Sequence, residues 1–136
     1  MLADARAALD QVIETIESSY EFMLAYAAQG RDQEVSGPGP SIRATLAAFD
    51  EALGALCDRI QAQAAGSPAS EAAFAQFLAV ARPDAAAARS ALRLALATPS
   101  ISSQLIDNLN ASIHIRALLT DVFLVDEALK SFARTA

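Results

Sequence analysis

The stretch LDQVIETIESSYEFMLAYAA, residues 9–28, decides the fold class of this chain. Its apolar side chains recur at steps of four, three, four, three and four residues, which places them on one face of an α-helix. The second half, FMLAYAA, is apolar around the whole circumference, so we expect it to be buried on more than one side. We predict a helix over residues 3–29 that ends at Gly30. The residues of the apolar face are Leu9, Ile13, Ile16, Tyr20, Met23 and Ala27.

The same spacing continues beyond a glycine- and proline-rich loop at 30–40 and predicts a second helix over 41–65. Further helices are predicted over 68–82, 83–97 and 100–133. Pro83 is expected to end or kink the third helix, because proline clashes with the preceding turn. Ser67-Pro68 and Thr98-Pro99 resemble helix starts, with a capping residue followed by proline. The residues of the second apolar face are Ile42, Leu46, Phe49, Leu53, Leu56 and Ile60.

No segment alternates as a strand would, so the predicted fold is all-α: an antiparallel bundle of four to five helices, with a single domain over residues 1–136. Composition agrees with this prediction. Hydrophobic residues make up 54% of the chain and charged residues 19%, which argues against disorder. The 33 alanines favour helix, because alanine loses no side-chain entropy there.

Charge and cysteine content narrow the function classes. The net charge is −6 and the basic residues are scattered, which argues against a nucleic-acid partner. No apolar run reaches the roughly 20 residues of a membrane span. The single cysteine, Cys57, allows no intrachain disulfide and fits a reducing compartment, so we expect a cytoplasmic protein without a membrane partner.

The loop GRDQEVSGPGPSIR, residues 30–43, is a candidate anion site, because helix N-termini bind anions through free N–H groups. Pro38 and Pro40 have no N–H, so only Ser41, Arg43 and the first turn of the helix remain as weak ligand-binding candidates. Two other interpretations are open: a stiff connection between helices, or a docking loop for a partner.

Residues typical of catalytic or metal sites are few. His114 is the only histidine, and we expect Asp107 and Asn110 to share its helical face. One histidine falls short of a di-iron bundle, so we expect no metal and no cofactor. Cys57 has no activating neighbour and is expected to be buried. An acidic stripe is expected to be a solvated face or a patch for a basic partner; it comprises Asp10, Glu14, Glu17 and Glu21.

The second half of the last predicted helix, IRALLTDVFLVDEAL, is apolar around most of its circumference. A single bundle core cannot take up all of these side chains on one stripe, so either other helices surround this segment or part of it contacts a second molecule. The expected partner is a second copy of the chain or another protein. The candidate interface residues are Ile115, Leu119, Val122, Phe123 and Val125.

Three function hypotheses follow. The first is a non-catalytic interaction or regulatory protein that self-associates or acts as a subunit of a larger complex. The second is a small-molecule sensor or carrier with an apolar pocket between helices, lined by Phe22, Tyr26, Phe49 and Phe77. The third is an enzyme or minor enzyme subunit that acts through Arg43, the acidic stripe or His114. No catalytic residue is assigned, and the first hypothesis is favoured.

Overall fold

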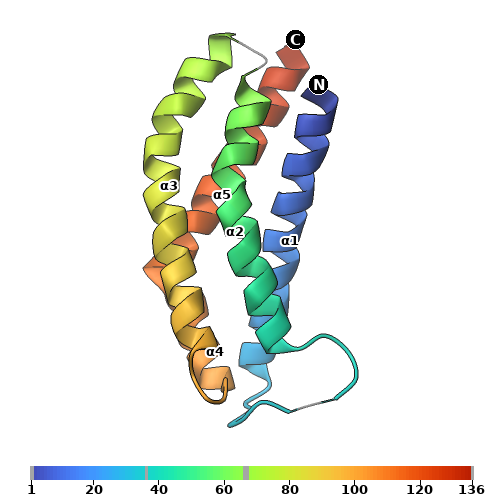
Figure 1. The fold of residues 1–136 in the computed structure, drawn as a ribbon, viewed down its shortest axis with the longest axis vertical. Coiled ribbons are helices and arrows are strands. Elements are labelled where there is room, and N and C mark those ends of the chain that lie inside the picture. The colour runs from blue at the N-terminus through green and yellow to red at the C-terminus, as the bar shows by residue number, and fades with distance from the viewer. Residues whose placement is uncertain (1, 36, 66–67, 136) are drawn as a thin grey trace.

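Five α-helices account for most of the residues that the computed structural model describes, which are 2–35, 37–65 and 68–135 (Figure 1). No strand occurs in these ranges. The prediction of an all-α bundle is therefore confirmed. The helices are α1 (Leu2–Ala28), α2 (Ile42–Ala64), α3 (Pro68–Leu96), α4 (Ser103–Ala111) and α5 (Ile113–Thr135).

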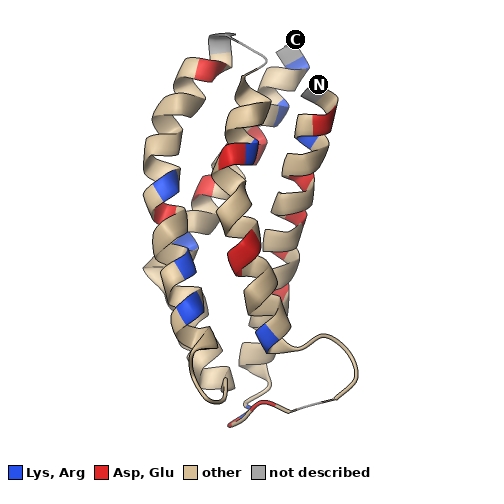
Figure 2. Ribbon diagram, in the orientation of Figure 1, with Lys and Arg blue, Asp and Glu red and all other residues tan. Residues whose placement is uncertain are grey.

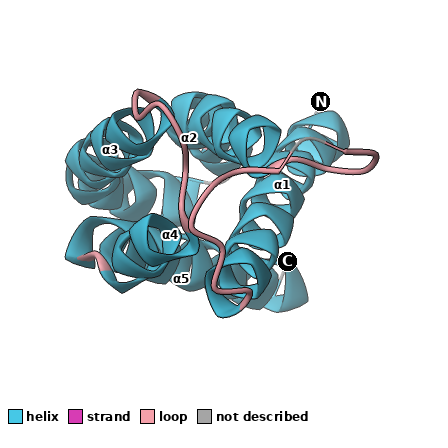
Figure 3. Ribbon diagram, turned by 90° about the horizontal axis from the view of Figure 1, so that it is seen from below, coloured by secondary structure: helices cyan, strands magenta, loops and turns pink. Residues whose placement is uncertain are grey.

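The four long helices run up and down the bundle, and the N- and C-termini lie at the same end (Figure 1). Helix α2 packs between α1 and α3, and α3 also packs against α5. Short helix α4 lies at the opposite end and packs mainly against α1. Viewed from that end, the loops that lead into α2 and α4 cross the base of the bundle (Figure 3).

The core runs the length of the bundle and draws residues from every helix. The two apolar faces predicted from spacing, on α1 and α2, supply much of it, because a stripe of apolar side chains is stabilised by burial against its neighbours. The largest fully buried side chains are Leu9, Ile16, Met23, Leu46, Phe49, Leu56, Ile60, Leu92, Ile101, Ile106, Ile115 and Leu118.

The predicted break at Pro83 is wrong, because α3 runs without interruption from Pro68 to Leu96. Pro83 removes the N–H that would bond the carbonyl of Ala79. Both residues lie on the exposed side of α3, so water can satisfy that carbonyl. Packing of the opposite, buried side then holds one continuous helix in place of the two predicted over 68–82 and 83–97.

The predicted helix over 100–133 is also corrected: it begins later and is divided at Ser112. Ser102, not Thr98, caps α4, and its side chain accepts a hydrogen bond from the Leu105 N–H at 3.0 Å. Ser112 has an extended ψ of 133°, and its Oγ accepts from the His114 N–H at 3.2 Å, which starts α5. The predicted cap at Ser67 lies outside the described residues.

Candidate functional site

The side of the bundle formed by α3 and α5 carries two long apolar stripes. On α3, the stripe recurs at steps of three and four residues, so its members lie along one side of the helix. On α5, a second stripe recurs at steps of four and three. The α3 stripe is Phe77, Val80, Asp84, Ala87, Ala91 and Leu94; the α5 stripe is Ile113, Ala117, Asp121, Leu124, Ala128 and Phe132. We call these twelve residues the α3–α5 face.

Large apolar side chains on this face are open to solvent. Their exposed fractions lie between 38% and 72%, whereas apolar side chains of this size are normally buried when a core is available. Apart from Asp84 and Asp121, neither stripe contains a charged residue. The exposed members are Val80, Leu94, Ile113, Leu124 and Phe132.

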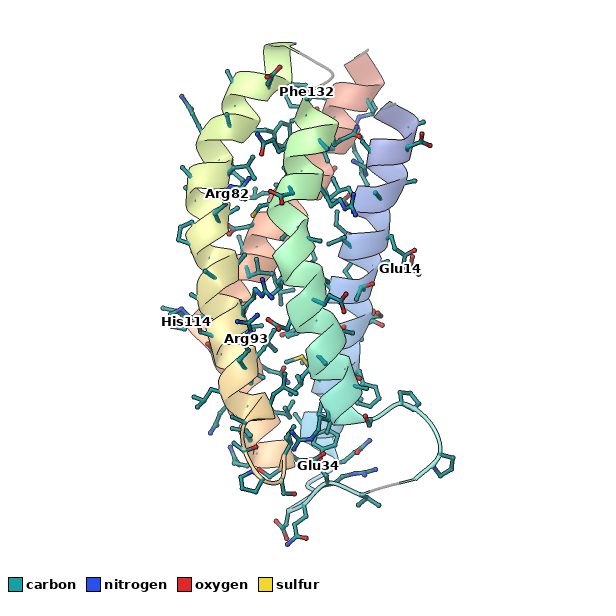
Figure 4. The ribbon with its side chains drawn as sticks, viewed as in Figure 1. Glu14, Glu34, Arg82, Arg93, His114 and Phe132 are labelled. Carbon is teal, nitrogen blue, oxygen red and sulfur yellow. The ribbon has the colours of Figure 1, made fainter. Side chains whose placement is uncertain are left out.

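An apolar groove of about 250 Å³ lies where the two stripes meet near the chain termini. The rings of Phe74 and Phe132 form its end, with centroids 5.9 Å apart and planes tilted by 55°. This tilted arrangement is one that aromatic pairs favour. Figure 4 places Phe132 at that end of the bundle. The groove is lined by Ala73, Phe74, Phe77, Leu124, Val125, Ala128 and Phe132.

Asp84 and Asp121 form a carboxyl pair in the middle of the α3–α5 face. Burial raises the pKa of Asp121 to about 7, and a hydrogen bond with Asp84 and the charge of Asp84 contribute in the same direction. A hydrogen bond between two carboxyl groups requires that one of them carries a proton. Asp121 is only 7% exposed, so its ionised form is costly. Asp121 is therefore protonated below pH 7 and about half protonated near pH 7.

The five predicted interface residues occupy two different environments. Ile115, Leu119, Val122 and Val125 are buried in the core, and Val125 also forms part of the floor of the apolar groove. Only Phe123 projects to solvent, with 55% of its surface exposed. Helix α5 does expose large apolar side chains, as expected. Apart from Phe123, however, the exposed residues are Ile113, Leu124 and Phe132 and not the ones that were predicted.

The four residues predicted to line a ligand pocket occupy different environments. Phe49 is fully buried in α2, and the Tyr26 hydroxyl donates to the Ile101 carbonyl at 2.6 Å, at the α4 end of the bundle. Phe22 is half-buried against the core. Phe77 lines the α3–α5 groove near the other end.

Arg43, one of the two candidate anion ligands, is already occupied by a carboxylate of the same chain. Its Nε and NH2 donate to the two oxygens of Glu34 at 3.2 and 2.5 Å. The guanidinium also donates to the carbonyls of Leu96 and Thr98 at 2.6 and 3.2 Å. The second candidate, Ser41, caps α2 by accepting from the Ala44 N–H at 3.0 Å.

Glu34 ties the loop at 30–40 to the base of the bundle. Besides Arg43, its carboxylate accepts from the Ile101 N–H at 2.8 Å, and its own N–H donates to Ser100 Oγ at 3.0 Å. The hydrogen bond from Arg43, together with the Ile101 N–H and the charge of Arg43, holds the pKa of Glu34 below its usual value despite burial. The described part of the loop therefore acts as a fastened connection between α1 and α2.

Acidic residues recur along α1 (Figure 2). The acidic stripe is exposed and borders a groove of about 520 Å³ that Asp126 and Lys130 of α5 line on its other side. Arg6 spans this groove, bonding Asp10 at 3.0 Å and Asp126 at 3.1 Å. Lys130 also bonds Asp126 at 3.1 Å. The stripe itself, Asp10, Glu14, Glu17 and Glu21, matches the expected solvated face.

His114 projects into solvent at the start of α5 (Figure 4). The break at Ser112 separates it from Asp107 and Asn110, so the expectation that these three share one helical face is wrong. Asn110 is buried and donates to the Met23 carbonyl at 3.2 Å. Cys57 is buried as expected, and burial raises the pKa of its thiol, with the charges of Asp58 and Asp121 adding to the effect and Arg82 opposing it.

In the described part of the chain, no group of three or more His, Cys, Asp or Glu side chains is placed to hold a metal ion. None of the helices, over their described residues, combines the length and the apolar character that crossing a membrane requires.

Comparison of the chain with protein-family models, with curated proteins and with solved structures gave no match. Asp84 and Asp121 were not predicted as site residues from the sequence. The signal that could have found them is the three- and four-residue spacing of the two stripes to which they belong.

Proposed function

We propose that this chain is a non-catalytic interaction protein that associates with a second copy of itself through the α3–α5 face. The observation that carries the proposal is the distribution of exposed apolar side chains. Eight large hydrophobic residues are exposed among those described, and five of them belong to this one face. Contiguous exposed apolar surface of this kind is typical of protein–protein contacts.

The α3–α5 face is the surface at which charge opposes a second copy least. Each chain carries a net charge of −6, so two copies repel each other over most approaches. The α3–α5 face lacks charged residues apart from the carboxyl pair, in which Asp121 is about half protonated near pH 7. A two-fold arrangement would bring the same apolar patch of each copy together, and such self-complementary contacts are the commonest in homodimers.

The size of the groove favours a protein partner over a small molecule. Its volume of about 250 Å³ falls below the roughly 300–1,000 Å³ of typical ligand pockets. It is open along the face and lined by apolar side chains, which suit apolar side chains of a second copy. Aromatic residues seated in apolar pockets often dominate the binding energy of interfaces.

Two matched charge substitutions test the proposal. Leu124→Glu places a carboxylate in the α3–α5 face, and Leu24→Glu places one on α1, where Leu24 is exposed to a similar extent. We expect Leu124→Glu to weaken self-association by roughly 100-fold, because a buried unpaired charge costs several kcal/mol, and Leu24→Glu to leave it unchanged. Sedimentation velocity measures both, and circular dichroism checks that both variants fold. Equal association by the two variants would contradict the proposed interface.

A further inference from the structure

A further groove, of about 350 Å³, is lined by residues of α2 and α3. Three arginines of α3 line it, at positions seven and four residues apart, a spacing that keeps them on one side of the helix. Figure 4 labels two of them, Arg82 and Arg93, on the side of α3 that faces α2, and Figure 2 shows the basic residues of α3. The groove is lined by Leu53, Gly54, Cys57, Arg82, Ala85, Ala86, Arg89, Ser90 and Arg93, without any acidic residue.

Asp50 accepts hydrogen bonds from two of the three arginines, Arg89 and Arg93, in each case from the Nε nitrogen. Arg89 Nε donates to Asp50 Oδ1 at 2.8 Å, and Arg93 Nε donates to Asp50 Oδ2 at 3.2 Å. Among the hydrogen bonds of the described residues, none uses a terminal nitrogen of Arg89 or Arg93. A guanidinium fixed at Nε keeps its other N–H groups available for the oxygens of a second acid.

Gly54 makes room for Arg89. A Cβ at position 54 would lie 2.7 Å from NH1 of Arg89 and 3.0 Å from its Cζ, closer than non-bonded atoms approach. Glycine in a helix interior costs roughly 1 kcal/mol relative to alanine. At this position in α2 it lets the guanidinium of Arg89 lie against the helix backbone, and Gly54 and Arg89 both line the groove.

The groove and its ion-pair partners carry a net positive charge, although the whole chain is acidic. The three arginines of the groove and their two carboxylate partners, Asp50 and Asp58, sum to +3 − 2 = +1, against −6 for the chain. Asp58 is 78% exposed, so water screens its bond to Arg82. Asp50 is not among the lining residues, and its two oxygens fix the orientation of Arg89 and Arg93.

We propose that the α2–α3 groove is a binding site for a phosphate group, held between the terminal nitrogens of Arg89 and Arg93. Arginine is suited to phosphate because its planar fork matches two oxygens at once. The groove volume falls within the range of small-molecule sites. Arg82 lies seven residues, or roughly 10 Å, from Arg89 along α3. Its NH1 and NH2 donate to the exposed side chains of Asp58 at 3.3 Å and Gln61 at 3.1 Å, and a second anionic group of a longer ligand would replace these partners. This site is independent of the proposed self-association.

Side-chain NMR tests the proposal directly. Inorganic phosphate and pyrophosphate are titrated into the full chain while the Nε–Hε signals of the arginines are followed. We expect saturable shifts of Arg89 and Arg93 with both probes, and a shift of Arg82 with pyrophosphate alone. Linear, unsaturated shifts of all arginines, including exposed Arg116, would indicate general charge attraction and overturn the proposal, as would the absence of shifts.

Two variants and one control sharpen this test. Arg93→Gln should weaken phosphate binding about tenfold, in line with the loss of charge-assisted hydrogen bonds, whereas Arg116→Gln makes the same change in net charge at a distance and should have no effect. Gly54→Ala, which favours the helix, should displace Arg89 and abolish the phosphate-induced shifts while the helical circular dichroism is kept. Equal weakening by Arg93→Gln and Arg116→Gln would overturn the proposal.

Discussion

Asp84 on α3 raises the pKa of buried Asp121 on α5, in the middle of an otherwise uncharged face, and Asp121 Oδ2 is buried without a hydrogen-bond partner. The pair joins two helices that meet through apolar side chains on either side of it. Its protonation therefore influences both the stability of the chain and any contact that covers the face. Two predictions concern this pair.

The first prediction is that Asp121→Asn stabilises the chain at pH 8. The folded state binds the Asp121 proton more tightly than the unfolded state, because the pKa rises from 3.8 to about 7 on folding. The free energy of unfolding therefore falls as pH rises from about 4 to about 7, by at most about 1.4 kcal/mol for each step of one in pH. Asparagine is neutral at every pH, so its advantage should appear at pH 8 and vanish near pH 4. Urea denaturation at the two pH values measures the difference; equal stability of variant and wild type at pH 8 would argue against the buried pair.

The second prediction is that self-association is tighter at pH 6 than at pH 8. Covering the α3–α5 face removes water from the carboxyl pair, which favours its protonated form. Association would then take up protons, and we expect the dissociation constant to be roughly tenfold lower at the acidic pH. Sedimentation equilibrium at both pH values tests this. In Asp121→Asn the pH dependence should largely disappear, and its persistence would assign the effect to other groups.

The third prediction concerns the clasp formed by Glu34 and Arg43. Glu34→Gln should destabilise the chain by roughly 1–2 kcal/mol at neutral pH, through loss of charged hydrogen bonds partly screened by water. The pKa of Glu34 is lowered in the folded state, so the stabilisation is present above the usual value of 4.5 and is lost as pH falls below it. The gap between wild type and variant should therefore close in acid.

Hydrogen exchange adds a local measure of the same clasp. We expect faster exchange of the N–H groups of Glu34 and Ile101 in Glu34→Gln, because both bond within the clasp. Thr15→Val, a change on α1 far from the base, serves as control and should leave these groups protected. Unchanged protection in Glu34→Gln would mean that other contacts hold the loop.

The fourth prediction is that Pro83→Ala stabilises the chain. Pro83 lies in the interior of α3 and is exposed, so its replacement restores a backbone hydrogen bond without loss of packing. We expect a gain of roughly 1–3 kcal/mol, less than the full helix penalty of proline because α3 has adapted to it and proline also restricts the unfolded chain. Thermal or urea unfolding measures the gain, and a destabilised variant would contradict this account of α3.

The existence of the helices could be predicted from sequence because their apolar spacing persists over many turns. Leu9 to Ala27 and Ile42 to Ile60 each keep one face through six positions, and burial of those faces follows from the pattern alone. The two errors at helix breaks have a common cause. Pro83 is tolerated because it lies on the exposed side of α3, whereas Ser112 starts a new helix through its side-chain oxygen. The local sequence does not reveal which side of a helix will face water.

The candidate site could be predicted only in part. The surplus of apolar residues on α5 is evident in the sequence, but which of them reach the surface depends on the packing around α5. Leu124 is exposed and Val125 is buried although they are adjacent. The pairing of Asp84 with Asp121, and the approach of Arg89 to Gly54, depend on which helices are neighbours, and this is set by the whole fold.

The molar mass of the wild-type chain in solution tests the central claim most directly. Light scattering across a dilution series at pH 6 should give twice the chain mass of 14.2 kDa at high concentration, falling toward 14.2 kDa on dilution. A mass of 14.2 kDa at every concentration would contradict self-association through the α3–α5 face.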